Sequence, residues 1–348
     1  MIVYLVTKQH QYTIHSFLHE WQPALAKRFK VMAYEDLPQT TSLPLGTYIF
    51  SDIELLGPAS TEMAMQVWEA LSSSGQAVRL YNHPRRVMRR YELLRTLSAS
   101  GQNQFEARHP CDGLGGLEFP VFLRNGRDHF GPSTLLLHTS RELRQALWIQ
   151  KLRRADMKNM LVVEFCDIAD EAGLCRKYSS FIVGDRVIPR HVLFSTQWVQ
   201  KYPDLLTDAQ AAEQMAYLQT NPHCKQLLEI FRTARIDYGR IDYSMLNGQV
   251  QVWEINTNPT IIFPRSKYLP QSLGAQDYFV ERMSEAWAAL DTVQEGLPDL
   301  PFHLDTGLVR RVEAESRAEA NAEQRYQNGR RRLMKIPLFW WGKYDYRV

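Results

Sequence analysis

Four water-preferring side chains lie on one short segment of this sequence, RIDYSMLNGQVQVWEINTNP, residues 240–259. The segment has the alternating pattern of a β-hairpin around an Asn-Gly turn. Charged groups on a strand that faces a core are costly, so this face is either wet or binds a ligand that needs oxygen atoms. The four residues are Arg240, Asp242, Glu254 and Asn256.

The turn of this hairpin decides whether these side chains meet, because strand side chains alternate between the two faces of a sheet. A two-residue Asn247-Gly248 loop pairs Asp242 with Trp253, which sends Asp242 and Glu254 to opposite faces. A three-residue loop that includes Leu246, with a G1 bulge at the glycine, shifts the register by one and brings all four polar residues to one face. The turn chemistry permits both.

If the side chains converge, two carboxylates and an amide carbonyl without His or Cys suit a hard cation such as Mg²⁺. So few protein ligands leave coordination positions for water and phosphate oxygens, and Arg240 beside the metal contacts the same phosphates. The alternative is an exposed hairpin with scattered polar residues.

The elements that must hold this hairpin begin with alternating strands and helices. Strands are predicted at 2–6, 30–34, 47–52 and 77–82, and helices at 13–29 and 59–73. Such alternation favours a small parallel α/β domain, which we place at residues 1–83.

Residues 84–295 have the pattern of an α+β region. A basic helix follows Pro84, and the strands after it form antiparallel pairs, because a Gly-Asp turn separates two alternating runs. The predicted strands are 119–125, 161–166, 175–183 and 186–194, and the predicted helices are 140–154, 208–219, 223–234 and 276–290.

The last segment, residues 296–348, combines a charged helix at 310–335 that has no apolar stripe with an aromatic and basic tail. The arginine run 330–332 with Trp340 and Trp341 favours a solvated helix with an aromatic plug. The alternatives are contact with RNA or a membrane surface and an arm that docks on a partner subunit.

The bulk composition indicates a globular cytoplasmic protein. The chain has 348 residues, 45% hydrophobic and 23% charged, and its net charge of +3 gives no reason to expect a nucleic-acid partner. Its four cysteines form no CxxC pair, so reduced thiols are expected. No leader peptide and no membrane span are predicted.

The hairpin resembles the metal-binding segment of the ATP-grasp superfamily, in which Arg-x-Asp is followed by a turn and then Glu-Ile-Asn-x-x-Pro. It is similar in particular to D-alanine–D-alanine ligase-like and glutamate-adding carboxylate–amine ligases. The resemblance implies a small α/β domain followed by a two-lobed ATP-grasp fold. It also implies that Asp242, Glu254 and Asn256 coordinate Mg²⁺ on ATP and that Arg240 stabilises the transferred phosphate.

The same likeness assigns the nucleotide contacts over residues 82–290. LVVEFCD resembles the strand that ends at the adenine, which implies that Glu164, Phe165 and Cys166 lie beside the base and that Asp167 or Asp170 reaches the ribose. The sequence departs from the family where FPVFLRN carries Arg124 in place of the phosphate-binding lysine. It departs again where NGRDHFGPS stands for the glycine-rich phosphate loop.

Basic residues on two middle strands complete the predicted site. In the family a basic residue from this region contacts the phosphates, and Arg176 and Lys177 are the candidates, of which only one can point inward. Arg190 is expected to hold a phosphate or the substrate carboxylate. A solvent-facing strand residue is the alternative in each case. His15 and His19 have the spacing of a zinc pair but lack a third ligand, which favours a solvated helix face.

The resemblance implies an ATP- and Mg²⁺-dependent ligase that joins a carboxylate to an amine through an acyl phosphate. Its partners would be small-molecule or peptide substrates, and a homodimer is possible because related ligases are often dimers. The alternatives are a phosphotransferase of the same fold and a nucleotide-binding protein without turnover.

Overall fold

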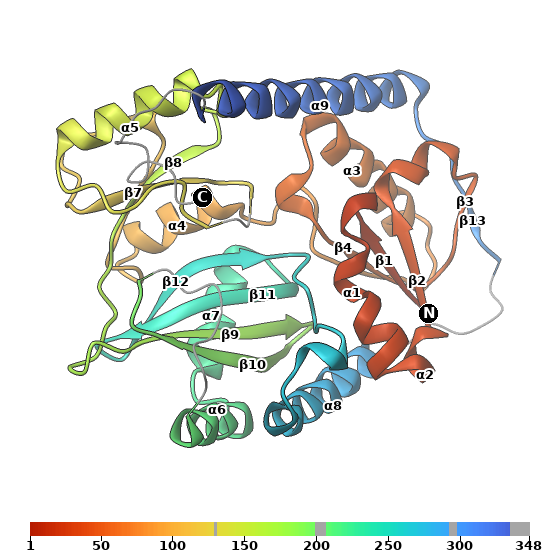
Figure 1. Ribbon diagram of the computed structural model, residues 1–348. Coiled ribbons are helices and arrows are strands. Elements are labelled where there is room, and N and C mark those ends of the chain that lie inside the picture. The colour runs from red at the N-terminus through yellow and green to blue at the C-terminus, as the bar shows by residue number, and fades with distance from the viewer. Residues whose placement is uncertain (129–130, 199–206, 292–297, 335–348) are drawn as a thin grey trace.

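The computed structural model describes residues 1–128, 131–198, 207–291 and 298–334, and the side chains among them up to residue 329. The described chain combines one parallel sheet with antiparallel sheets and helices (Figure 1). The predicted mixed α/β character is confirmed at this level. The aromatic tail beyond residue 335, with Trp340 and Trp341, lies outside the described residues.

The first sheet is parallel, with the strand order β2-β1-β4-β5. Its strands are β1 (Ile2–Val6), β2 (Phe29–Ala33), β4 (Thr47–Phe50) and β5 (Arg79–Tyr81). All five residues of β1 are buried, as expected for the inner strand of a parallel sheet. The predicted helix at 13–29 is divided into α1 (Tyr12–Ser16), a π-helical turn and α2 (Pro23–Ala26), and α3 spans Pro58–Ser72.

A smaller antiparallel sheet, order β6-β8-β7, follows with two helices. We call this unit the small lobe: α4 (Arg90–Ala99), β6 (Ala107–Arg108), β7 (Val121–Asn125), α5 (Ser140–Leu152) and β8 (Met160–Glu164). Leu123 and Val162 pair across the sheet and pack on Leu143 and Leu147 of α5, so this lobe has its own core.

The second antiparallel sheet has the order β10-β9-β11-β12 and contains the hairpin. The strands are β9 (Cys175–Val183), β10 (Arg186–Ser195), β11 (Tyr238–Leu246) and β12 (Gln249–Asn256), and the helices are α6 (Asp208–Thr220), α7 (Cys224–Ala234) and α8 (Leu273–Leu290). Gly184 and Asp185 form the turn between β9 and β10, as predicted. Leu227 and Phe231 of α7 share one core with the parallel sheet, so the two sheets are packed together.

The charged C-terminal helix, α9 (Thr306–Met334), runs along the molecule from α3 toward α5 (Figure 1). Its first turns bury Leu308 and Val312 in the core that the parallel sheet shares with α7, so the helix is anchored there and is not solvated on all sides. Glu319 pairs with Arg127 of the small lobe at 3.3 Å. Farther along, a Cβ on Gly329 would lie 2.7 Å from the Arg153 carbonyl oxygen, so only glycine permits this close approach.

Glu315 of α9 caps the N-terminus of α3, where the N-cap residue is a glycine without a side chain. Its carboxylate accepts hydrogen bonds from the Ala59 and Ser60 amides at 2.8 and 3.0 Å. A carboxylate at this position also interacts favourably with the helix dipole. A side chain at Gly57 would collide with this carboxylate, so the glycine makes room for a cap supplied from far along the chain.

Replacing Glu315 with alanine is therefore expected to lower the free energy of unfolding by about 1–2 kcal/mol, the usual contribution of an N-cap. Urea denaturation followed by circular dichroism measures the change. Glu313→Ala on the same helix is the matched control, since Glu313 is exposed and pairs with Arg317 one turn away. Equal stability of the two variants would contradict the capping role.

Candidate active site

The hairpin brings its polar residues together through a bulge inside β12. The turn is the two-residue Asn247-Gly248 loop, with φ of 51° and 78°, and Leu246 pairs with Gln249. The register then shifts after Tyr243, so that Asp242 lies opposite Glu254. The four polar side chains therefore do meet on one face, as one of the two registers predicted. The turn itself has two residues and not three, and the bulge within β12 supplies the shift in register.

Trp253 is the extra residue of this bulge. Its indole nitrogen donates to the Ser244 hydroxyl at 3.0 Å, and its ring stacks on Phe105 with centroids 5.1 Å apart. Just before it, Asn103 pairs its side chain with the backbone of Val252, which supports the edge strand at the point where the register changes. A bulge re-aims the residues that follow it, and here it directs Glu254 toward Asp242.

The Asp242 carboxylate is buried among cations. Arg240 Nε lies 2.9 Å and Lys177 Nζ 3.0 Å from its oxygens, and the Ser179 hydroxyl donates to it at 2.8 Å. Burial alone would raise the pKa of Asp242, but the charges of Arg240 and Lys177 outweigh it and hold this pKa well below the usual range. The carboxylate is therefore ionised at neutral pH.

The Glu254 carboxylate contacts two arginines of the small lobe. Arg124 on β7 donates to Oε2 at 2.9 Å, and Arg90 on α4 forms an ion pair with the same oxygen. Arg90 also donates to the carbonyl oxygens of Asn125 and Asp128 at 2.9 and 2.7 Å, which fixes the start of the loop after β7. Burial, and next the Arg90 charge, lower the pKa of Arg124 to about 10, so Arg124 stays cationic at neutral pH.

Asn256 is the last residue of β12 and lies opposite Arg240 in the ladder. It is buried, and its side-chain oxygen accepts from the Asn258 amide at 2.8 Å. Arg240, Asp242, Glu254 and Asn256 therefore occupy two facing pairs on β11 and β12, with the Ile241–Ile255 pair between them. The predicted gathering of these four residues is what the structure shows, whereas their roles remain proposals.

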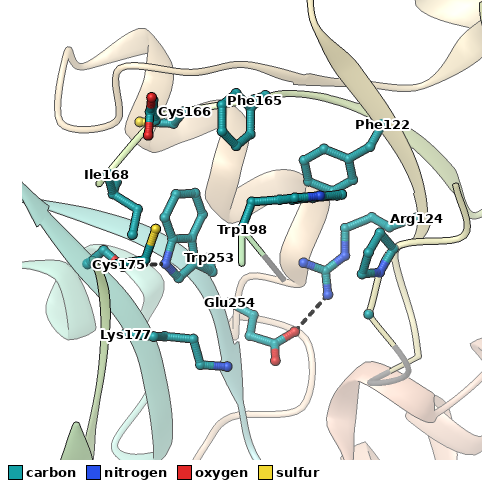
Figure 2. A pocket seen from close by; sticks show the side chains of 14 residues that line it. Phe122, Arg124, Phe165, Cys166, Ile168, Cys175, Lys177, Trp198, Trp253 and Glu254 are labelled. Carbon is teal, nitrogen blue, oxygen red and sulfur yellow. Dashed lines mark hydrogen bonds and ion pairs between the residues drawn. The ribbon is translucent and has the colours of Figure 1, made fainter. Parts of the chain in front are cut away.

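A pocket lies between the small lobe and the hairpin sheet (Figure 2). One part of it is aromatic and aliphatic, and the other is charged, with Arg124, Lys177 and Glu254 directed toward one another (Figure 2). The apolar side chains are contributed by both lobes: Phe122, Phe165, Ile168, Trp198 and Trp253.

Several residues predicted to contact the nucleotide line this pocket: Arg124, Phe165, Cys166, Asp167 and Lys177. Burial raises the pKa of the Cys166 thiol to about 11, so it is neutral and unreactive at physiological pH. Glu164 precedes them at the end of β8, but its carboxylate accepts from the backbone amides of Glu106 and Glu118 at 2.8 Å each. Glu164 therefore organises the loops around the pocket and does not line it.

Arg176 and Arg190, which were also predicted to contact the nucleotide, are not among the residues that line this pocket. Arg176 forms ion pairs with Asp170 and Glu213 at 2.6 and 2.7 Å, on the strand face opposite to Lys177. Lys177 is thus the inward member of that pair. Asp170, a candidate for the ribose, is engaged by Arg176.

Arg190 is buried, donates to the Ile261 carbonyl and the Tyr268 hydroxyl at 3.1 Å each, and lies over the Phe279 ring. It is not among the lining residues. Its guanidinium joins the loop after the hairpin to α8, so the structure assigns it a packing role at this position.

The sequence reasoning did not single out Arg90, Ser179, Phe122 or Trp198. Arg90 had a detectable signal, since it lies in a basic helix directly after the predicted domain boundary. Ser179 lies two residues after Lys177 on the same strand and so shares its face, which places its hydroxyl beside Asp242.

The donor set fits a magnesium ion in chemistry, since two carboxylates and one amide oxygen are hard oxygen ligands. Among the residues that the structure describes, no group of three or more His, Cys, Asp and Glu side chains is placed to hold a metal ion. Both carboxylates are paired with cations, so a metal would bind together with an anion that draws those cations away.

Comparison with known proteins gives structural matches only, since no protein-family model and no curated protein matches the chain. D-alanine–D-alanine ligase from Bacillus anthracis, complexed with ATP, is 14% identical with a TM-score of 0.46, over 90% of this chain and 99% of the ligase. An ATP-grasp RimK domain protein from Sphaerobacter thermophilus is 14% identical with a TM-score of 0.44, over 80% of this chain and 97% of its own. The ATP-grasp ligase PsnB, complexed with a minimal precursor, is 12% identical with a TM-score of 0.46, over 83% and 99%.

Two of these three structures, the RimK domain protein and PsnB, are described as ATP-grasp proteins. Because the TM-scores are below 0.5, the functional proposal depends on the residues of the site. No helix in the described ranges is both long enough and apolar enough to cross a membrane.

Proposed function

We propose that this protein is an ATP- and Mg²⁺-dependent carboxylate–amine ligase of the ATP-grasp type. The observation that carries the proposal is the charge balance around the hairpin. Four cations gather around two carboxylates beside an aromatic pocket. Such a cluster of cations suits a polyanion with a flat base attached, which is the chemistry of a nucleoside triphosphate. The four cations are Arg90, Arg124, Lys177 and Arg240.

The pocket suits the nucleotide in one orientation. The base would lie among Phe165, Trp198 and Trp253, beside the backbone of Phe165 and Cys166 that follows the end of β8. The phosphates would extend toward Arg124 and Lys177 in the charged part. Asp167 at the rim is the group left to meet the ribose, since Asp170 pairs with Arg176.

In the proposed reaction ATP phosphorylates a substrate carboxylate, and an amine then displaces phosphate from the acyl phosphate to form an amide. Mg²⁺, held by Asp242, Glu254 and Asn256, would neutralise phosphate charge during the transfer. Arg240 would leave Asp242 to hold the acyl phosphate, while Lys177 and Arg124 would hold the triphosphate. Catalysis of this kind needs groups that are already positioned to stabilise the negative charge of the transferred phosphate, and it needs no protein nucleophile.

The test is incubation of the purified protein with ATP, Mg²⁺ and pooled amino acids, with ADP and free phosphate measured separately. Equal amounts of ADP and phosphate that depend on the pool support the ligase. ADP without free phosphate, accompanied by a phosphorylated product, would indicate a phosphotransferase. ATP binding without any ADP would indicate a binding protein and would overturn the proposal.

The aromatic part of the pocket gives an independent prediction. Trp198 lies 5.1 Å from the Phe122 ring and 6.0 Å from the Phe165 ring, in the pocket lining. Stacking of a base on an aromatic ring contributes about 1–3 kcal/mol, so Trp198→Ala is expected to weaken ATP binding about tenfold or more. Calorimetric titration with ATP·Mg²⁺ measures the change. Trp148→Ala, on the exposed face of α5, is the control and should leave the affinity unchanged.

A further inference from the structure

One polar side chain from each strand of the hairpin sheet lies in a single row across β10, β9, β11 and β12. His191 on β10 pairs with Ser179 on β9, and Ser179 pairs with Asp242 on β11. Asp242 in turn lies opposite Glu254 on β12. The row therefore begins at a histidine that is not among the pocket-lining residues and ends at two of the proposed metal ligands.

A bulge in β10 brings His191 into this row. Pro189 pairs with Ser180, but His191 pairs with Ser179, so Arg190 is the extra residue between them. Because strand side chains alternate, His191 would point to the other face of the sheet without this shift. The buried hydrogen bonds of the Arg190 guanidinium anchor the bulge.

Both outer strands of the sheet thus have a bulge beside the same row. The bulge at Trp253 directs Glu254 into the row, and the bulge in β10 directs His191 into it. Bulges are common next to active sites, where they re-aim a side chain. The second bulge therefore indicates that His191 belongs to the hairpin site.

The Ser179 hydroxyl joins His191 to Asp242. It lies 2.8 Å from Asp242 Oδ1 and 3.1 Å from His191 Nε2. An ionised carboxylate can only accept, so the single hydroxyl hydrogen is donated to Asp242. The serine oxygen then accepts from His191, which places the hydrogen of the imidazole on Nε2.

The order of these groups differs from that of a catalytic triad. In a triad the histidine lies between the serine and the carboxylate, whereas here the serine lies between the other two. Ser179 is also fully buried, so its oxygen does not reach a substrate. The arrangement orients a carboxylate and does not activate a nucleophile.

The His191 ring is neutral. Burial, and next the charge of Arg190, lower the pKa of His191 well below its usual range. Arg240 and Lys177 lower this pKa further, and Asp242 opposes them. The imidazole therefore holds the serine as an uncharged donor and adds no further positive charge beside the Asp242 carboxylate.

An uncharged donor can keep its place when a metal ion binds. Arg240 and Ser179 both donate to Oδ1 of Asp242, at 2.9 and 2.8 Å. Lys177 lies 3.0 Å from the other oxygen. A divalent cation would repel the arginine and the lysine but not the hydroxyl. The hydroxyl can therefore continue to hold the carboxylate after the two cations have moved.

We propose that His191 is a positioning residue of the metal site and acts through Ser179 to hold the Asp242 carboxylate in the orientation that binds Mg²⁺. The inference rests on the proposed function, which makes Asp242 a metal ligand. Groups that orient metal ligands in this way contribute about 10–100-fold to metal affinity or activity.

The test measures metal affinity apart from turnover. Mn²⁺ is used as the probe, because its electron paramagnetic resonance signal reports the free ion, and the β,γ-imido analogue of ATP prevents turnover. Mn²⁺ bound by the analogue alone is measured separately and subtracted. His191→Phe removes the donor and is expected to weaken Mn²⁺ binding to the protein–analogue complex about tenfold. His191→Gln places an amide donor near the position of Nε2 and should stay within about threefold of wild type.

A double variant tests whether His191 acts through the serine. Ser179→Ala should weaken Mn²⁺ binding at least as much as His191→Phe does. Adding His191→Phe to Ser179→Ala should then change the affinity by less than about twofold, because the connection is already broken. In a turnover assay, His191→Phe should raise the half-saturating Mg²⁺ concentration about tenfold and leave the KM for ATP at saturating Mg²⁺ within about threefold.

His223→Phe is the matched control. It removes another hydrogen bond between a histidine and a hydroxyl of this sheet, 2.8 Å from His223 Nδ1 to the Tyr243 hydroxyl, on the face opposite to Asp242. Its Mn²⁺ affinity should equal that of wild type. Circular dichroism checks folding, and His191→Asn, whose shorter amide falls short of Ser179, decides the outcome if His191→Phe does not fold.

Two results would overturn the inference alone. One is equal Mn²⁺ affinity in wild type and His191→Phe, and the other is an equal loss in His191→Phe and His223→Phe, which would indicate a general loosening of the sheet. A wild-type protein that binds no Mn²⁺ together with the analogue would overturn the proposed function as well.

Discussion

The Asp242→Asn variant is expected to lose ATP turnover by about 10³-fold, the largest catalytic effect that we anticipate from a single change. Loss of one preorganised electrostatic group commonly costs 10²–10³-fold in rate. Asp242 is both a proposed metal ligand and the partner of Arg240 and Lys177. Because its pKa is depressed, the carboxylate is charged throughout the neutral range, and asparagine differs from it at every working pH.

The measurement is Mg²⁺-dependent ADP formation at saturating ATP. Asp185→Asn, in the exposed turn between β9 and β10, removes one negative charge outside the site and should retain full activity. Circular dichroism of both variants separates lost chemistry from lost folding. An Asp242→Asn protein with more than a tenth of the wild-type rate would show that this carboxylate does not hold the metal.

Arg124→Met should produce the largest loss of nucleotide affinity, about 100-fold in Kd for ATP. The Arg124 side chain is 11% exposed, contacts Glu254 and lines the pocket, so its charge would meet the phosphates with little competition from water. A charge-assisted hydrogen bond contributes about 1.5–3 kcal/mol, so two of them at the lower end of this range, about 3 kcal/mol, account for a loss of about 100-fold. Calorimetry with ATP·Mg²⁺ at neutral pH, well below the Arg124 pKa of about 10, measures it.

Two further variants define what Arg124 contributes. Arg124→Lys keeps the charge but loses the planar pair of donors, so its Kd for ATP is expected to lie between those of wild type and Arg124→Met, about tenfold above wild type. Arg95→Met, on an exposed position of α4, is the control and should bind ATP normally. If Arg124→Met binds ATP as tightly as this control, the phosphates lie elsewhere.

Much of the fold followed from local patterns. The alternation of strands and helices before residue 83 and the paired strands β9 and β10 were predicted because periodicity and turn residues act over a few neighbours. The divided helix between Tyr12 and Ala26 was not predicted, since its π-helical turn depends on how Phe17 and Trp21 fit into the core. Tertiary packing decides such a feature, and the sequence alone does not show it.

The sequence predicted which hairpin residues form the site better than it predicted the contacts that position them. The four hairpin residues were expected to meet, but the bulge at Trp253 depends on Phe105, Ser244 and Asn103, which no local pattern around the turn reveals. Arg90 reaches Glu254 from 164 residues away in the sequence. Long-range ion pairs of this kind carry no spacing signal, and for the same reason the partners of Arg176 and Arg190 could not be anticipated.

The cap that Glu315 places on α3 comes 255 residues after Ser60. A nascent chain emerges from its N-terminus first, so α3 must remain without this cap for most of the time that the protein takes to be synthesised. Chains that stop before Glu315 would also lack the contact of Glu319 with Arg127. Prematurely terminated chains should therefore have a frayed α3 that cellular proteases can cleave. Proteins with an incomplete pocket should then not accumulate.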